Sequence, residues 1–147
     1  MPAEEARIEY ARVVAELDYP LEAVWRVVSA FGGVERWIAG VDSCAVEGSG
    51  VGAVRVVGLA GRTVGERLDR LDQAEHTIVY SVLPPHAMPA ENVRGTIQLR
   101  AVSPGTTAVT WRSDATRIDG NPAALSARIE AFYRASIEGL RRLLAEG

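Results

Sequence analysis

The chain has 147 residues, of which 48% are hydrophobic and 24% are charged, and this balance predicts one soluble globular domain spanning 1–147. Its net charge of -3 gives no basic surface for nucleic acid or for an anionic membrane. All 16 basic residues are arginine, so a Schiff-base lysine and a P-loop lysine are both excluded.

Cysteine and histidine are sparse. Cys44 is the only cysteine, which excludes an intramolecular disulfide and favours a reducing compartment. The two histidines, His76 and His86, have no metal-ligand spacing to it, so we predict neither a metal nor another cofactor. No apolar run approaches the roughly 18 residues of a membrane helix, and the charged start does not resemble a secretion signal. We therefore expect a cytoplasmic protein without membrane insertion.

The N-terminal part is predicted to hold one strand and two short helices. Residues 10–18 alternate apolar and polar side chains, which is typical of a strand with one buried face. Pro20 then opens a helix, with Asp18 as its possible cap, and a second short helix covers 34–38. The apolar residues at helical spacing in the first helix are Leu21, Val24, Trp25 and Val28.

Residues 42–117 change to short strands separated by turns. Their alternation predicts six strands, and the short connections favour an antiparallel meander over alternating βαβ units. The turn residues cluster at 48–50, 59–61, 72–75, 84–89 and 103–106.

A long helix is predicted from Pro122 to the C-terminus, with Asn121 as its cap. One side carries a broad apolar stripe, and the other is a solvated charged surface. The stripe consists of Leu125, Ile129, Phe132, Tyr133, Ser136, Ile137, Leu140 and Leu144. The charged side consists of Arg128, Glu130, Arg134, Glu138, Arg141 and Arg142.

These elements predict an α+β fold in which a seven-stranded antiparallel sheet curls around the long C-terminal helix, with two short helices after the first strand. The sheet cannot bury its apolar face alone, so the helix must cover it. A curled sheet and a helix enclose a cavity between them. Such a cavity suits a small apolar molecule.

Glu66 is the most informative residue of the predicted sheet. With a two-residue period, Val64, Glu66 and Leu68 point to one face of their strand, so the acid points with the hydrophobic residues. A buried carboxylate without partners is costly. The face is therefore expected to open on a cavity that holds water, a ligand or other polar groups. The alternative is a strand end or twist that lets Glu66 reach solvent.

The element order resembles that of the helix-grip superfamily, which includes START lipid-transfer domains, birch-pollen-allergen-like proteins, bacterial polyketide cyclases and plant abscisic-acid receptors. Gly58-Leu59-Ala60 is similar to the Gly-Leu-Pro gate loop of the receptors, and residues 66–72 are similar to the strand after it. The resemblance implies that Glu66 takes part in a water-mediated network to a ligand. It also implies a position on the pocket wall for Tyr80 and a polar position on the last helix for Ser136.

The chain also departs from the receptors. They hold the ligand carboxylate with a pocket lysine, and their Gly-Gly-x-His-Arg-Leu latch is replaced here by residues 84–88. An abscisic-acid receptor is therefore not expected. The ligand should be neutral or differently anchored, unless an arginine such as Arg55 supplies a positive charge, although apolar residues lie on both faces of the Arg55 strand.

The function predicted from the sequence is the binding of a small hydrophobic or aromatic molecule in an internal pocket. One alternative is a polyketide cyclase or aromatase, with Glu66 and Tyr80 as catalytic residues and Tyr133 assisting, although tyrosines in such positions are more often core aromatics with a satisfied hydroxyl. Another is a protein-interaction module acting through its loop surface. The expected ligand-contacting residues are Leu59, Ala60, Val64, Glu66, Tyr80, Val82, His86, Met88, Val93, Trp111, Phe132, Tyr133 and Ser136.

Two loops, 58–61 and 84–89, are expected to close over the ligand, with Gly58 and Gly61 as hinges. His76 is expected to be exposed. Leu59 and Met88 are expected to be exposed on the loops, where they could support a homodimer, so the chain is predicted to be a monomer or a homodimer. Glu66→Gln is expected to alter ligand preference or activity with little loss of stability.

Overall fold

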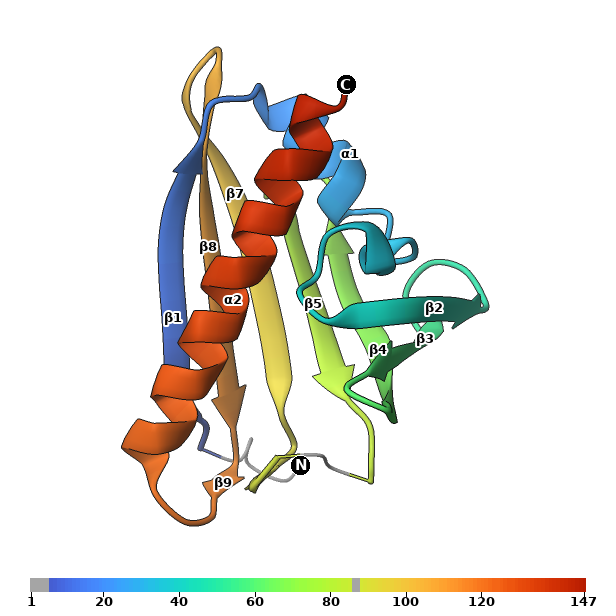
Figure 1. Cartoon of the computed structure of the whole chain (residues 1–147), viewed down its shortest axis with the longest axis vertical. Helices are drawn as coiled ribbons and strands as arrows, with labels where there is room; N and C mark the ends of the chain where they lie inside the picture. The colour runs from blue at the N-terminus through green and yellow to red at the C-terminus, as the bar shows by residue number, and fades with distance from the viewer. Residues whose placement is uncertain (1–5, 86–87) are drawn as a thin grey trace.

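A seven-stranded antiparallel sheet and a long helix lying across it make up most of the protein in the computed structural model, which describes residues 6–85 and 88–147 (Figure 1). The strands of this sheet are β1 (Ile8–Leu17), β2 (Val41–Glu47), β3 (Val54–Leu59), β4 (Arg62–Asp72), β5 (Thr77–Val82), β7 (Arg94–Ser103) and β8 (Thr106–Ala115). They are ordered β1-β8-β7-β5-β4-β3-β2, and every neighbouring pair is antiparallel. The predicted sheet is confirmed.

The remaining elements pack around this sheet. They are α1 (Leu21–Val28), the 3-10 helix η1 (Val34–Arg36), α2 (Pro122–Ala145) and the short strands β6 (Ala90–Glu91) and β9 (Arg117–Ile118). The second predicted helix is thus only one 3-10 turn, and the small β6-β9 ladder is an addition that the sequence did not predict. Within the described residues, no helix has both the length and the hydropathy needed to cross a bilayer.

A side-chain cap is present at the start of α2 but absent at the start of α1. The Asn121 side chain accepts hydrogen bonds from the backbone N–H groups of Ala123 (3.0 Å) and Ala124 (3.3 Å), so the predicted cap of α2 is confirmed. The predicted Asp18 cap of α1 is wrong. The residue preceding α1 is Pro20, which makes no side-chain capping bond.

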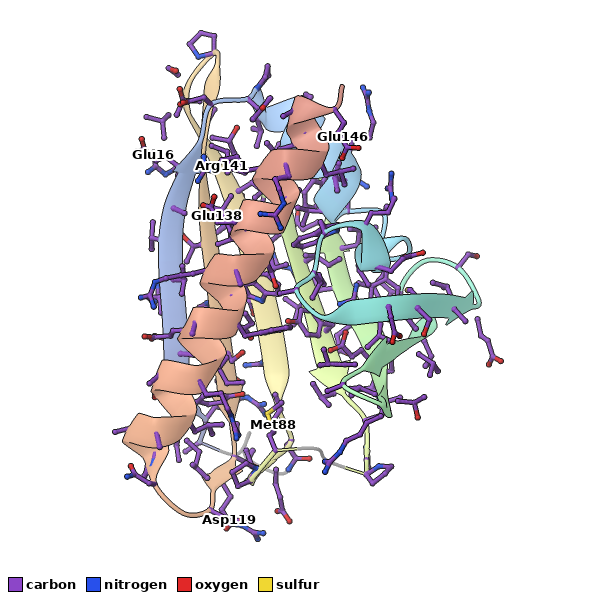
Figure 2. All side chains as sticks on the ribbon, viewed as in Figure 1. Glu16, Met88, Asp119, Glu138, Arg141 and Glu146 are labelled. Atoms are coloured by element: carbon purple, nitrogen blue, oxygen red, sulfur yellow. The ribbon has the colours of Figure 1, made fainter. Side chains whose placement is uncertain are left out.

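The helix α2 is fixed to the edge strand β1 by side-chain hydrogen bonds to the backbone. Glu130 accepts from the N–H of Arg12 at 3.0 Å, Ser126 donates to the carbonyl of Tyr10, and Arg141 donates to the carbonyl of Glu16 at 3.2 Å. Figure 2 shows Glu16 and Arg141 at one end of this contact, with Met88 and Asp119 at the opposite end of the molecule. These bonds satisfy backbone groups on the side of β1 that faces away from β8.

The turn between β3 and β4 is shorter than the sequence predicted. Gly58 lies within β3, paired with Ser43 on one side and Thr63 on the other, and only Ala60 and Gly61 form the turn. Both turn residues have positive φ, 53° and 77°, as two-residue hairpin turns of type I′ require. A hinge at Gly58 is therefore wrong, because ladder hydrogen bonds hold its strand on both sides.

Candidate functional site

A cavity of about 250 Å³ lies between the sheet and α2. It exceeds the engineered cavity of about 150 Å³ that binds benzene, and it is smaller than most pockets for drug-sized ligands, which start at about 300 Å³. Its size therefore suits one small molecule. Most of its wall is hydrocarbon, contributed by Ile38, Val41, Val57, Leu59, Val64, Val82, Met88, Val93, Ile129 and Phe132, together with the rings of Tyr10, Tyr80, Trp111 and Tyr133.

An arginine and a glutamate form an ion pair within this apolar wall. Arg55 on β3 and Glu66 on β4 are direct partners across the hairpin, and Nε and Nη2 of Arg55 both lie 2.7 Å from Oε1 of Glu66. Arg55 is only 4% exposed. The carboxylate of Glu66 is therefore compensated by the protein itself, and the pair adds no net charge to the cavity.

Arg55 also holds the chain that follows α1. Its Nη1 donates to the carbonyl of Phe31 at 2.9 Å, and its guanidinium carbon lies 4.4 Å from the centre of the Phe31 ring and 5.1 Å from that of Tyr80. Phe31 has a positive φ of 62°, which is uncommon for a bulky residue. The cation thus stabilises a turn outside the sheet through one hydrogen bond and a cation–π contact.

The second carboxylate oxygen of Glu66 has a different environment. The hydrogen bond from Arg55 Nε and the ion-pair contact of Nη2 both go to Oε1, and among the described residues no hydrogen bond reaches Oε2. Glu66 lines the cavity, and its side chain is 15% exposed. Oε2 can therefore accept a hydrogen bond from a molecule inside the cavity.

Neutral polar groups form a second cluster on β5, β8 and α2. The indole N–H of Trp111 donates to the hydroxyl of Tyr80 at 3.0 Å, and the Trp111 ring stacks on Tyr133 with 4.1 Å between ring centres and an interplanar angle of 10°. The hydroxyl of Tyr133 is hydrogen-bonded to Ser113. Burial raises the pKa of both tyrosines far above the ordinary value, so both hydroxyls keep their protons even at alkaline pH where an exposed tyrosine ionises.

A glycine sets the position of the Tyr80 ring. Gly95 on β7 is the direct partner of Tyr80 on β5, and a β-carbon at residue 95 would clash with the phenol ring. The ring therefore lies over the backbone of β7, where any side chain would displace it.

The fold and the apolar cavity agree with the comparison to known proteins. The family model described as polyketide cyclase/dehydrase and lipid transport matches residues 10–145. The chain belongs to this family. Its helix-grip fold is also seen in an uncharacterised protein from Bacillus thuringiensis, with a TM-score of 0.81, 21% identity, and 95% of this chain and 99% of that chain covered.

Two further structures share the fold of this family member. The solution structure of a protein from Thermobifida fusca has a TM-score of 0.79 and 22% identity, and the match covers 92% of this chain and 93% of that one. Ara h 8.0201 has a TM-score of 0.77 and 15% identity, with 97% and 100% covered. At these identities the likeness establishes the fold alone.

In this family member, most of the residues expected to contact a ligand do line the cavity. They are Leu59, Val64, Glu66, Tyr80, Val82, Met88, Val93, Trp111, Phe132 and Tyr133. Leu59 and Met88 are half-buried against the core, so the prediction that they are exposed is wrong. His86 lies outside the described residues.

Two of the expected residues do not reach the cavity. Ala60 lies in the β3-β4 turn, outside the cavity lining. Ser136 on α2 is fully buried against the segment after η1. Its hydroxyl donates to the Phe132 carbonyl at 2.9 Å and accepts from the Ala39 N–H at 3.0 Å. A ligand-orienting role for Ser136 is therefore wrong, since it holds the chain after η1 against the helix.

His76 also differs from its prediction. It is half-buried, with its ring 5.3 Å from that of Trp25 in an edge-on arrangement and its Nε2 3.2 Å from a carboxylate oxygen of Glu22. The contact joins the β4-β5 turn to α1, so His76 has a packing role. In the part of the chain that the structure describes, no three His, Cys, Asp or Glu side chains converge as metal ligands would.

Several lining residues were missed by the sequence analysis. They are Tyr10, Ile38, Val41, Val57, Ser113, Arg128 and Ile129. Tyr10 was assigned to no buried face, but a register shift between Glu9 and Ala11 turns both Tyr10 and Ala11 inward. Arg128 was assigned to the solvated face of α2, although it lies one turn before Phe132 and borders the apolar stripe.

Proposed function

We propose that this protein binds a small hydrophobic or aromatic molecule in the cavity between the sheet and α2, with Glu66 as the polar anchor. The observation that carries the proposal is that Glu66, a residue lining an apolar cavity of about 250 Å³, has one carboxylate oxygen that Arg55 does not engage. Apolar walls supply affinity, and one or a few placed polar groups orient the ligand. Membership of a family described by lipid transport and polyketide chemistry supports the same proposal.

The anchor selects for a hydrogen-bond donor on the ligand. Arg55 neutralises Glu66, so this end of the cavity presents an acceptor oxygen without a net negative charge. A hydroxyl or amide N–H can donate to Oε2 while the ion pair stays intact. The Tyr80 ring and the aliphatic wall then contact the hydrocarbon part of the ligand.

The second candidate is a cyclase or dehydratase reaction in the same cavity. It is favoured by the presence of Glu66 and Tyr80 on one cavity wall, since an acid–base reaction needs an acceptor and a donor of protons near the same substrate. The raised pKa of Tyr80, caused mainly by burial, makes this hydroxyl a reluctant acid. Binding is therefore the function that the geometry supports better.

The test is mass spectrometry of small molecules released when the purified protein is denatured. Glu66→Gln is the test variant, and Glu138→Gln, an exposed glutamate on α2, is the matched control. A stoichiometric apolar compound in the wild type and in Glu138→Gln, but not in Glu66→Gln, is the expected result. A compound that Glu66→Gln retains in full would refute the anchor role. If no compound is found with any of the three proteins, the cyclase should be tested by product formation from a polyketide mimic.

A further inference from the structure

Arg128 is a charged residue at the cavity for which the proposed binding function has no role. The charged residues in the described lining are Arg55, Glu66 and Arg128. The first two neutralise each other across 2.7 Å. The described wall therefore carries one net positive charge, and it resides on Arg128.

The position of Arg128 places this charge at the mouth. Arg128 is exposed, whereas Ile129 and Phe132, the next lining residues of α2, are half-buried. Met88, which also lines the cavity, lies at the same end of the molecule as the start of α2 (Figure 2). A molecule entering between these residues would pass the guanidinium before reaching the apolar interior.

The guanidinium of Arg128 has no ion-pair partner among residues 6–85 and 88–147. The acidic residue that shares its surface depression is Asp119, whose carboxylate is bound by Arg117 at 3.1 Å. Of the other three arginines on α2, Arg134 pairs with Glu130 and Arg141 with Glu138, whereas Arg142, like Arg128, has no ion-pair partner in the described part of the chain. The donors of Arg128 are thus available to a ligand.

We propose that the ligand is an amphipathic carboxylate whose apolar body fills the cavity and whose anionic group lies at the mouth against Arg128. This inference rests on the proposed binding function and names the class of molecule bound. An arginine fork matches a carboxylate in shape and charge. The interior, by contrast, has no uncompensated cation in its described wall, so a carboxylate would be poorly stabilised there.

Isothermal titration calorimetry with two probes of equal size tests this orientation. The probes are 6-hydroxy-2-naphthoate and 6-hydroxy-2-naphthamide, which share one apolar body and a hydroxyl that can donate to Glu66, and differ in the charge of the group at the other end. The naphthoate is expected to bind about fivefold more tightly at low salt, as a partly exposed ion pair allows. High salt should bring the two dissociation constants together, because it screens the charge at the mouth.

Arg128→Gln and Arg142→Gln form a matched pair of variants. Both arginines are exposed on α2, but Arg142 lines a different depression, about 21 Å along the helix. Arg128→Gln should weaken naphthoate binding about fivefold more than naphthamide binding, so that the two dissociation constants become equal. Arg142→Gln should keep the preference. Equal melting temperatures of the two variants would show that folding is not the cause.

Three results would overturn the inference. Equal binding of the two probes by the wild type would refute it while leaving the binding function intact. Equal loss of preference in Arg128→Gln and Arg142→Gln would replace a site at the mouth by a general effect of net charge. Absence of binding by both probes would count against the proposed function itself, and the inference would fall with it.

Discussion

The two polar clusters of the cavity wall avoid the cost of burying an unpaired charge in different ways. On β3 and β4, Arg55 and Glu66 keep their charges and cancel them against each other. In the cluster on β5, β8 and α2, the hydroxyls of Tyr80 and Tyr133 carry no charge, and burial raises their pKa so that they stay neutral over a wider pH range. The charged cluster depends on both of its members, whereas the neutral cluster can lose one hydroxyl at moderate cost.

The largest loss of stability is expected when one member of the charged cluster is removed and the other is kept. Arg55→Met should lower the free energy of unfolding by about 3–5 kcal/mol, since it leaves Glu66 in an apolar wall without its cation. It also removes the hydrogen bond to the carbonyl of Phe31. Chemical denaturation measures this loss.

The control is the double variant Arg55→Met/Glu66→Leu, which removes both charges. It should recover most of the lost stability, because no uncompensated charge remains. A loss of stability in the double variant equal to the sum of the losses in Arg55→Met and in Glu66→Leu alone would show that the two residues do not act as a pair.

A somewhat smaller effect is expected in the neutral cluster from Gly95→Ala. The new methyl group would clash with the Tyr80 ring and push it toward the cavity, costing about 1–3 kcal/mol. Binding of 6-hydroxy-2-naphthamide should weaken at the same time. Gly105→Ala, at a turn with open space around the new carbon, is the control. Unchanged binding in Gly95→Ala would mean that the ring position does not shape the site.

Glu66→Gln is expected to cost about 1–2 kcal/mol, because the amide oxygen can still accept from Arg55 but carries no charge. This revises the small loss expected from the sequence alone, which assigned Glu66 no fixed partner. Thermal denaturation at neutral pH measures it, with Glu138→Gln as reference. A loss as large as that of Arg55→Met would show that the introduced amide does not keep the hydrogen bond.

The smallest effect at neutral pH is expected for Tyr133→Phe, about 1 kcal/mol, since the ring stack on Trp111 remains and only the bond to Ser113 is lost. Alkaline pH should reveal more. The unfolded chain releases the tyrosine proton near the ordinary pKa of about 10, whereas the folded state, with its raised pKa, keeps the proton. The stability of the fold is therefore unaffected below that pH and decreases as the pH rises above it. The melting temperature of the wild type should therefore fall above that pH, and that of Tyr133→Phe should fall less steeply. Parallel curves would contradict the buried, protonated state of Tyr133.

The side of the sheet on which Glu66 lies could be predicted because it depends on the alternation of side chains within one strand. The cap at Asn121 could be predicted because it depends on neighbouring residues in the sequence. The Arg55–Glu66 pair could not, because it depends on register. The sequence analysis assigned 58–61 to a loop, so β3 would end at Val57, and this assignment does not reveal that Arg55 pairs with Glu66. With a two-residue turn at Ala60 and Gly61, the hairpin register brings Arg55 directly opposite Glu66.

Tyr10 and Arg128 were missed as lining residues for the same physical reason. Contacts between elements cannot be read from the sequence of a single segment. The bulge in β1 that turns Tyr10 inward is seen only when β8 is laid beside it. Arg128 looks like a surface charge on an isolated helix, because the cavity beside it is formed by the sheet. Helical and strand periodicity thus predicted the wall of the site, while its charge balance required the assembled fold.

The hydrogen bonds from α2 to the outer backbone groups of β1 also limit how copies of this protein could associate. Glu130, Ser126 and Arg141 occupy positions that an added strand would need, so the sheet is closed to growth on that side. The other edge, β2, has no strand beyond it in the seven-stranded order. If two molecules paired through their β2 strands, the remaining sheet edge of each would be β1, whose outer backbone groups are already hydrogen-bonded to α2. Strand pairing between copies would therefore stop at a closed pair, and the fibre that continuous pairing produces could not form by this route.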